Sequence, residues 1–315
     1  MTALHAQHHP DCYPSTFADA LDFFRSAFES FPGDQQRIQA GDGVLAGIVS
    51  PHIDFRVSMA AYAAAFRPLL DEPLADTYLI LGVGHRSRLE WNLDRRDYIT
   101  PLGRAICATE MVDSLVTGTP PEQHFSPKAH EGEHSIEFPL LWLQALHQLR
   151  ASPGEKTAPV RFIPILCGSL HGYVEGFEEW DDLKDFHRLS CQLGTLLEKN
   201  PAGEKLRIIV SIDGCHLGPR FDHPFQVTSP LLKATAGWEE KLWACVARGY
   251  VRTFLDWMRV EGNDRYFDGV GALALLLAAG KFRIQRTHYE QWFTAQDAST
   301  VTFSSGRIYK NLLSS

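Results

Sequence analysis

Three histidines stand where apolar, strand-like runs end, and together their side chains could bind a metal ion. His52 lies in the segment VSPHIDF, His85 in GVGHR and His216 in SIDGCH. A lone histidine at such a place usually has only a structural role. If the three strands are parallel neighbours, however, their carboxyl ends meet, and neutral imidazoles facing one crevice make a site for a divalent metal. The sequence therefore predicts that His52 is committed to a metal.

The elements that would position these histidines alternate between strands and helices. Four short apolar runs predict buried strands at residues 43–50, 78–84, 161–168 and 206–213. Between them, helical periodicity marks residues 59–70, 110–118, 135–149 and 183–199. This alternation predicts an α/β fold, in which a central, mostly parallel or mixed sheet is flanked by helices on both faces. Ligands of such sheets gather at the carboxyl ends of the strands.

The last third of the chain is less regular. Its pattern predicts an amphipathic helix at 238–258, a helix of small apolar residues at 269–280, and two closing strands at 282–290 and 299–309. No repeat, linker or break in composition divides the chain. Residues 1–315 are therefore expected to form a single domain.

The net charge of -8 narrows the range of partners. A surface for nucleic acid or an anionic membrane would require clustered Lys and Arg, and the sequence has no such cluster. The first residues lack the basic flank and apolar stretch of a signal peptide, and no run approaches the roughly 18 apolar residues of a membrane span. We therefore expect a cytoplasmic protein that binds neither nucleic acid nor membranes. The six cysteines are too scattered to suggest a zinc knuckle or a disulfide framework.

The segment EGEHSIEFPLL opens the helix predicted at 135–149. His134 and Glu137 fall one turn apart on the same face of this helix. One interpretation is a capping arrangement, in which Ser135 or Glu133 satisfies free backbone N–H groups. The other is that His134 lines the crevice where the helix enters the core. The residues alone leave both open.

The segment VSIDGCHLGPRF carries the densest set of polar side chains. A nucleophilic pair of Cys215 and His216 is disfavoured, because side chains adjacent in sequence usually diverge. His216 is instead the expected acid or base, oriented by Asp213. Cys215 is expected to fill buried space beside the pocket.

Together these segments resemble the Memo family, of the AmmeMemoRadiSam system protein B type, whose fold is shared with class III (LigB-type) extradiol dioxygenases. That family has, in order, the motifs PHAG, LGPSHH, EHSIE, VPILVG and SSDxxH. This chain has PHID, LGVGHR, EHSIE, IPILCG and SIDGCH, of which only EHSIE is intact, so it resembles a divergent member. The resemblance implies a metal crevice with His52 and His85 as ligands, His216 as acid or base with Asp213 beside it, and His134 lining the pocket.

A third ligand is implied by a departure from the family. Memo-type proteins have a cysteine, in ICG before a small-residue helix, where the dioxygenases have a glutamate ligand. The resemblance aligns Asp268 with that cysteine; Asp264 is a substitute, and capping of the helix is an alternative role for Asp268. An aspartate is already ionised at neutral pH, as a ligand must be. Two imidazoles and a carboxylate form the facial triad of non-heme iron oxygenases, so Fe(II) is the expected metal, with Zn, Mn or Cu as alternatives.

Further charged residues stand close to these positions. Asp54 replaces the glycine of PHAG, and it would either bond the second nitrogen of His52 or cap a helix beginning near Arg56. Arg86 replaces the second histidine of LGPSHH, and it would either pair with an anionic group of a substrate or remain solvated. Glu137 is a further candidate for the pocket.

The sequence does not decide whether the chain is an enzyme. The implied reaction is O₂-dependent ring cleavage or oxidation of a catechol-like, anionic aromatic compound at a mononuclear non-heme iron, with His216 moving the proton. One rival is a zinc-dependent hydrolase with the same ligands. The other is a non-catalytic Memo-type module that binds a metal or a partner, such as a radical-SAM or AMMECR1-type protein.

Overall fold

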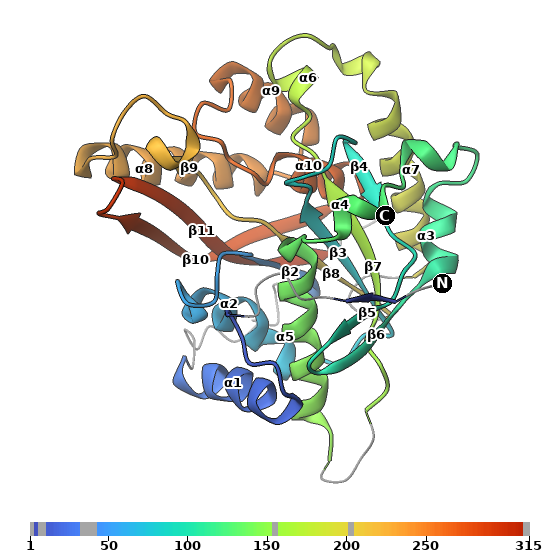
Figure 1. Ribbon diagram of the computed structural model, residues 1–315. Helices are drawn as coiled ribbons and strands as arrows, with labels where there is room; N and C mark the ends of the chain where they lie inside the picture. The colour runs from blue at the N-terminus through green and yellow to red at the C-terminus, as the bar shows by residue number, and fades with distance from the viewer. Residues whose placement is uncertain (1–2, 6–10, 32–42, 153–156, 201–204, 311–315) are drawn as a thin grey trace.

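The strands that precede the predicted histidines are neighbours at the centre of one sheet (Figure 1). The computed structural model describes residues 3–5, 11–31, 43–152, 157–200 and 205–310. Its central strands β7, β3, β8 and β2 are parallel and lie in that order. Their bounds are Arg161–Cys167, Thr77–Val83, Leu206–Ser211 and Val44–Ser50. Nearly all of their residues are buried, as expected for apolar strands covered on both faces.

Shorter and antiparallel strands extend the sheet on both sides. Beside β2 lie β11 (Ser299–Lys310) and β10 (Phe282–Thr294), which form an antiparallel hairpin. Beside β7 lie β6 (Gly103–Cys107), β5 (Tyr98–Thr100) and β1 (Leu4–His5), while β4 (Trp91–Leu93) pairs with β7 and β9 (His216–Leu217) with β11. The described residues thus form a mixed sheet of 11 strands, which confirms the predicted α/β class.

Helices cover both faces of this sheet, as predicted. α1, α2 and α5 pack together on one face, and α3, α7 and α10 lie on the other, where α9 and α8 extend the layer. The helices of the described residues are α1 (Phe17–Ser30), α2 (Met59–Phe66), α3 (Thr109–Leu115), α4 (Pro127–His130), α5 (His134–Arg150), α6 (His171–Val174), α7 (Lys184–Lys199), α8 (Ser229–Val246), α9 (Val251–Glu261) and α10 (Val270–Ala279), with 3₁₀ turns η1 (Arg67–Leu70), η2 (Pro121–Gln123), η3 (Trp180–Asp182) and η4 (Pro219–Phe221). None of these described helices is both long and apolar enough to cross a bilayer.

Two predicted helices differ from those observed. The helix expected at 238–258 is divided into α8 and α9, because the chain turns at Gly249, whose φ of 77° is accessible to glycine and strained for other residues. The helix predicted at 59–70 begins at Met59 as expected, where the Ser58 side chain accepts the N–H of Ala61, but it ends at Phe66 and continues as the 3₁₀ turn η1, and no helix begins near Arg56. Helix α1 and strands β4 to β6 were not predicted.

The register of the central strands aligns the ends that carry the histidines. Ser50 of β2 pairs with Ser211 of β8, and Leu81 of β3 pairs with Val210 of β8. The chain leaving β2, β3 and β8 therefore emerges at the same edge of the sheet. This is the edge where ligands of parallel α/β sheets bind.

The first turn of α5 is attached to this edge. The N–H of Val83, the last residue of β3, donates to Ser135 Oγ at 3.1 Å, and that hydroxyl donates to the Val83 carbonyl at 2.9 Å. A Cβ on Gly82 would lie 2.6 Å from Ser135 Oγ, so only a glycine allows this approach. The contact holds the start of α5 beside the end of β3.

Candidate metal centre

His52 follows β2 directly behind Pro51 and is only 1% exposed. Its Nδ1 lies 3.2 Å from the carbonyl oxygen of Ser211. Because a carbonyl oxygen only accepts hydrogen bonds, the neutral ring carries its proton on Nδ1. Nε2 is therefore the atom that His52 offers to a metal ion.

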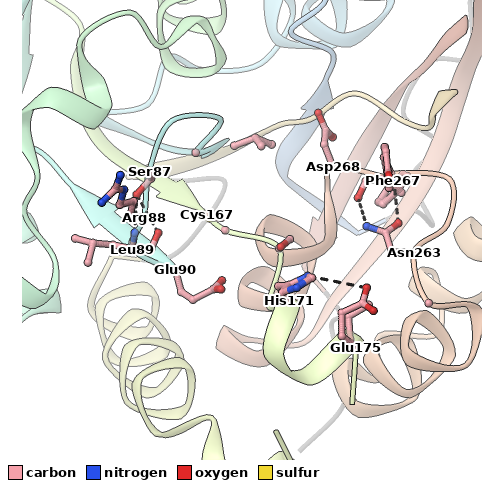
Figure 2. A pocket seen from close by; sticks show the side chains of 17 residues that line it. Ser87, Arg88, Leu89, Glu90, Cys167, His171, Glu175, Asn263, Phe267 and Asp268 are labelled. Atoms are coloured by element: carbon pink, nitrogen blue, oxygen red, sulfur yellow. Dashed lines mark hydrogen bonds and ion pairs between the residues drawn. The ribbon is translucent and has the colours of Figure 1, made fainter. Parts of the chain in front are cut away.

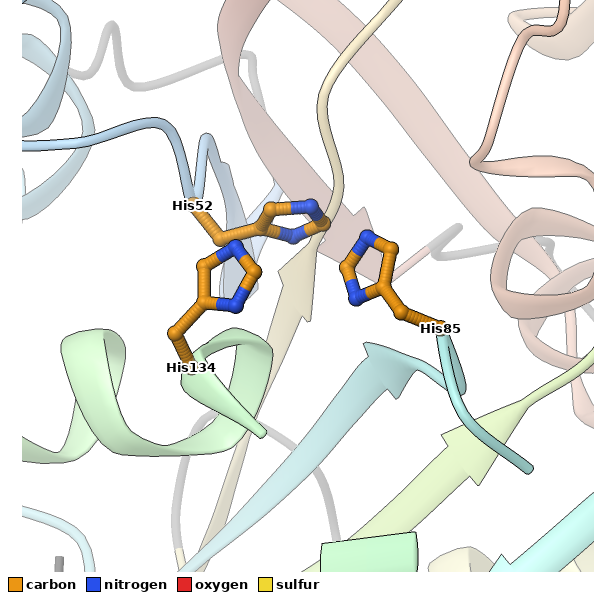
Figure 3. Close-up of side chains that lie close together, drawn as sticks. All are labelled: His52, His85 and His134. Atoms are coloured by element: carbon orange, nitrogen blue, oxygen red, sulfur yellow. The ribbon is translucent and has the colours of Figure 1, made fainter. Parts of the chain in front are cut away.

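His85 and His134 bring two more imidazoles to His52 (Figure 3). The ring centroids of His52 and His85 are 5.0 Å apart, and His134 lies 5.1 Å from His52 and 5.0 Å from His85. One nitrogen from each ring lies within 4.8 Å of the other two. Histidines from three separate segments thus meet in space, one after β2, one after β3 and one at the start of α5. We call them the imidazole group.

A second group joins His52 to two carboxylates. The Nε2 of His52 lies 3.1 Å from Asp268 Oδ2 and 3.8 Å from Asp213 Oδ2. The ligand atoms of these three residues, which we call the carboxylate group, also lie within 4.8 Å of one another. Two ligands about 2.1 Å from one cation and at right angles would be about 3 Å apart, close to the separation of His52 from Asp268.

The atoms that face each other in the carboxylate group lack other partners. Among the described residues, His52 Nε2 and both side-chain oxygens of Asp268 are buried, and apart from their close approach to each other they have no hydrogen-bond partner. Buried polar atoms are normally paired, since leaving them unpaired is costly. Buried atoms that face each other and have no further partner are typical of ligands.

The charges of this group suit a cation. Burial alone would lower the pKa of His52, but the carboxylates of Asp213 and Asp268 outweigh it and raise the pKa to about 10. Burial also opposes ionisation of Asp268, yet His52 and His216 hold its pKa below the usual value. Asp213 Oδ1 accepts the backbone N–H of His52 at 2.9 Å and that of Ile53 at 3.1 Å. A divalent cation binding here would displace the proton of His52.

The three predicted ligands are divided between the two groups. His52 belongs to both, His85 to the imidazole group and Asp268 to the carboxylate group. Their donors are nitrogen and carboxylate oxygen, which iron, manganese and zinc all accept, and neither group in the described part of the chain includes a cysteine. The residues therefore fit a divalent metal, with His52 as the common ligand.

The two alternatives for the third ligand are clearly separated. Asp264 is exposed, and its backbone carbonyl lies 3.0 Å from His223 Nε2, outside both groups. Asp268 does not cap α10, because Gly269 holds the N-cap position and no side chain bonds the first turn there. The structure thus gives Asp268 no capping role and places it against His52.

His216 opens β9 beside these residues. Its Nδ1 lies 3.2 Å from the carbonyl oxygen of Gly214 and 3.1 Å from that of Tyr266. Both oxygens are acceptors, so the neutral ring keeps its proton on Nδ1 and Nε2 is the basic atom. The prediction that Asp213 orients His216 is wrong, because Asp213 binds the backbone at residues 52 and 53 and the two carbonyls orient the ring.

Asp54 and Glu137 lie near the centre but have other partners. Asp54 accepts the backbone N–H of Arg56 at 2.8 Å and also bonds its guanidinium, so the expected bond to His52 is not formed. Glu137 is fully buried and accepts a hydrogen bond from the Tyr13 hydroxyl. Neither side chain belongs to the imidazole group or to the carboxylate group in the described chain.

Cys215 is fully buried, as expected of a space-filling residue. Its backbone N–H donates to Thr302 Oγ1 at 2.6 Å, and burial together with Glu239 raises the pKa of its thiol far above the usual value. A thiol in this state is a poor nucleophile and a poor ligand.

Glu133 is the site residue that the sequence suggested only as a cap. Its carboxylate lies 3.0 Å from His85 Nδ1 and 3.5 Å from His134 Nδ1. Burial opposes its ionisation, but the bond to His85 and the charges of both histidines outweigh burial and lower the pKa to about 2. The only signal in the sequence was its place beside His134 in EHSIE, because contact with His85 depends on the fold.

A cleft of about 400 Å³ opens beside Asp268 (Figure 2). Sites for small molecules have volumes of this order. Its walls include Arg88 and Glu90 after β3, His171 in α6 and Tyr266 before α10. Arg86, for which the sequence left open a partner of an anionic substrate and a solvated position, is exposed and does not line this cleft.

The loop that leads to Asp268 forms one wall of the cleft. Asn263 holds this loop through two hydrogen bonds to Phe267, drawn as dashed lines in Figure 2. Its Oδ1 accepts the Phe267 N–H at 2.9 Å, and its Nδ2 donates to the Phe267 carbonyl at 3.1 Å. Tyr266, within this loop, has a φ of 47°, which is rare for an aromatic residue. Asp268 therefore reaches His52 from a constrained loop.

Fold and site together define an α/β protein with a candidate metal centre of histidines and carboxylates at the carboxyl edge of a mixed sheet, beside an open cleft. The model of the family described as Memo-like protein matches residues 5–306. That match spans nearly the whole chain, so the chain belongs to the Memo-like protein family, which confirms the resemblance seen in its motifs.

Individual relatives match at lower coverage. A MEMO1 family protein of Thermus thermophilus is 24% identical over 269 residues, which cover 84% of this chain and 70% of the relative. One of Aquifex aeolicus is 26% identical over 181 residues, covering 56% of this chain and 41% of the relative. One of Methanopyrus kandleri is 30% identical over 144 residues, covering 44% and 46%. The matched part is thus less than half the length of the last two relatives.

Proposed function

We propose that this chain holds a mononuclear iron that oxidises or cleaves a catechol-like aromatic compound with O₂. The observation that supports this proposal is the position of His52, which belongs both to the imidazole group with His85 and to the carboxylate group with Asp268, beside an open cleft that Asp268 lines. Two imidazoles and a carboxylate are the ligand set of non-heme iron oxygenases. Iron(II) bound there would supply redox chemistry that side chains lack, and positions open to substrate and O₂.

His216 is suited to take the proton of a substrate hydroxyl. Its Nδ1 is held by two carbonyl oxygens, which leaves Nε2 as the basic atom. The ring also interacts electrostatically with the carboxylates of Asp213 and Asp268, which places it close to the proposed metal ligands.

The cleft supports a small planar substrate. Tyr266 lines it, and its side chain is 49% exposed. Its left-handed backbone costs energy, and such strain is often retained at functional sites. Stacking against the Tyr266 ring would orient a planar substrate beside Asp268, two residues along the same loop.

A second candidate is a zinc-dependent hydrolase, and the imidazole group favours it. His52, His85 and His134 form a compact set of three histidines. Three protein ligands and a water are the usual arrangement of catalytic zinc. In that function His134 is a ligand and Asp268 is not, whereas the iron proposal assigns the opposite roles.

Protein purified anaerobically and reconstituted with Fe(II) tests both candidates. For the iron proposal we expect about one iron per chain, lost in Asp268→Ala and retained in His134→Ala. We also expect O₂ consumption with a member of a panel of catechols and aminophenols, and a large decrease in His216→Gln. Iron-loaded protein that consumes no O₂ with any member would contradict the oxygenase proposal. Loss of metal in His134→Ala alone would favour the zinc site.

A further inference from the structure

The carboxylate of Glu133 is more deeply buried than a helix cap requires. Glu133 is the N-cap of α5, and its Oε1 accepts the N–H of Ser135 at 3.0 Å. Caps are usually short polar side chains, and a buried carboxylate is costly unless it gains strong partners. Glu133 is only 1% exposed, so capping alone does not account for it.

The two neighbouring histidines supply those partners. The backbone N–H of His85 donates to Oε2 of Glu133 at 3.2 Å, and His85 Nδ1 lies 3.0 Å from Oε1 and 3.1 Å from Oε2. His134 Nδ1 lies 3.5 Å from Oε1, and its ring is stacked on that of His85 at an interplanar angle of 12°. One carboxylate therefore contacts both imidazoles that accompany His52.

These contacts determine which nitrogen of His85 is available. An ionised carboxylate accepts hydrogen bonds and donates none, so His85 Nδ1 must carry the proton. The lone pair of Nε2 is then left for a metal. His52 reaches the same tautomer through the neutral carbonyl of Ser211, at 3.2 Å. A carboxylate on the far nitrogen also makes a histidine ligand more basic.

The backbone holds Glu133 and His85 in register. Val83 of β3 and Ser135 of α5 exchange two hydrogen bonds. The two segments lie so close that a Cβ at Gly82 would not fit between them. Glu133 and His85 each lie two residues from this contact. Their bond is therefore fixed by the docking of α5 on β3.

We infer that Glu133 is a positioning residue of the metal centre, which fixes His85 in the tautomer that presents Nε2 and so increases the affinity for metal. The inference rests on the proposed metal site, but its first consequence, the tautomer of His85, exists without any metal. Carboxylates in this position typically change metal affinity by about 10- to 100-fold.

The tautomer is measured in metal-free, full-length protein with ¹⁵N-labelled imidazoles. Two-bond ¹H–¹⁵N correlation spectra distinguish the two protonated nitrogens, and His85→Gln assigns the signal. We expect the Nδ1–H pattern for His85 in the wild type. A wild-type His85 with its proton on Nε2 would overturn the inference.

Affinity is measured with Co(II) as the probe, in competition with a chromophoric chelator. In Glu133→Gln the amide oxygen still caps α5 but the charge is lost, and we expect binding to weaken by about 10- to 100-fold. Ser58→Ala is the matched control, because it removes the cap of α2 without touching a histidine, and its affinity should change by less than about twofold.

The outcomes separate this inference from the proposed function. Glu133→Gln that binds Co(II) as tightly as the wild type would overturn the positioning role. If that variant does not fold, Glu133→Asp replaces it, and the wild-type spectrum still decides the tautomer. A wild type that binds no Co(II) would contradict the metal site instead, with the tautomer of His85 remaining as the test of Glu133.

Discussion

Two histidines of this molecule are equally buried and have opposite electrostatics. His52 is 1% exposed and His130, at the end of α4, is 0% exposed. Burial lowers the pKa of His130 to about 4. At His52 the same effect is outweighed by Asp213 and Asp268, which raise the pKa to about 10. Burial therefore does not distinguish a candidate metal ligand from a structural histidine.

The rings of His130 and His52 also differ in the partners of their nitrogen atoms. His130 Nδ1 lies 3.2 Å from the Tyr98 hydroxyl, and its Nε2 lies 3.1 Å from the carbonyl of Asn92. Both nitrogens are satisfied, as in an ordinary core residue. His52 Nε2 instead faces two carboxylates, with Asp268 Oδ2 at 3.1 Å and Asp213 Oδ2 at 3.8 Å. A buried imidazole nitrogen that faces anionic groups is the feature that marks a candidate metal ligand.

The largest expected effect is on metal binding. His52→Ala and Asp268→Ala should each weaken the binding of a divalent metal by more than about 100-fold, because each removes a direct ligand. Matched controls are His130→Gln and Asp264→Ala, which change residues outside both groups and should leave metal content per folded chain unchanged. Metal is measured after dialysis of each variant. If His52→Ala retained all of its metal, His52 would be no more a metal ligand than His130.

The position of the first three histidines was predictable from the sequence for a physical reason. His52, His85 and His216 follow runs that are buried on both faces, and such runs form adjacent parallel strands whose ends coincide. The start of α5 was equally clear, because EHSIE is intact. These features depend on local pattern and on a few general rules of topology.

Features that depend on tertiary contacts were not predictable. The bond between Glu133 and His85 requires α5 to dock on β3 through Ser135, which no local pattern specifies. The prediction for Asp213 failed because its carboxylate accepts the backbone N–H of His52 and does not orient His216. His52 is 161 residues away in the sequence, so only the fold brings the two together. Helix α1, by contrast, has a cap that the sequence does show, because the Thr16 side chain accepts the N–H of Asp19.

The second largest effect is expected on the stability at acidic pH, to which His130 and His52 should contribute differently. The usual pKa of a histidine is 6.5, whereas burial lowers the pKa of His130 in the folded protein to about 4. As the pH falls from 6.5 toward 4, His130 becomes protonated in the unfolded chain but stays neutral in the folded protein. The free energy of unfolding therefore decreases. The loss between pH 7 and pH 5 is about 2 kcal/mol. His52 adds no loss in this window in metal-free protein, because its folded pKa is raised.

Urea unfolding of chelator-treated protein at pH 7 and pH 5 measures this difference. We expect His130→Gln to lose about 2 kcal/mol less stability than the wild type over that interval. An equal loss in the two proteins would show that His130 is not the group responsible.

The smallest expected effect is on the binding of an aromatic compound at Tyr266, which we compare with Tyr250, a second exposed tyrosine. Tyr266 lines the cleft and is 49% exposed, whereas Tyr250 caps α9 and is 68% exposed. Tyr266→Ala should weaken the binding of 4-nitrocatechol to metal-loaded protein by roughly 3- to 10-fold through lost stacking, and Tyr266→Phe should retain it. Absorbance titration provides the affinity. Equal affinities in Tyr266→Ala and Tyr250→Ala would argue against a stacking wall.

Anomalous diffraction from crystals of the Fe(II)-reconstituted protein, recorded on both sides of the iron absorption edge, tests the metal centre most directly. We expect one strong peak within about 2.5 Å of Nε2 of His52, with His85 and Asp268 as its other protein ligands. A peak whose ligands exclude His52, or no peak at this edge of the sheet, would contradict the proposed centre.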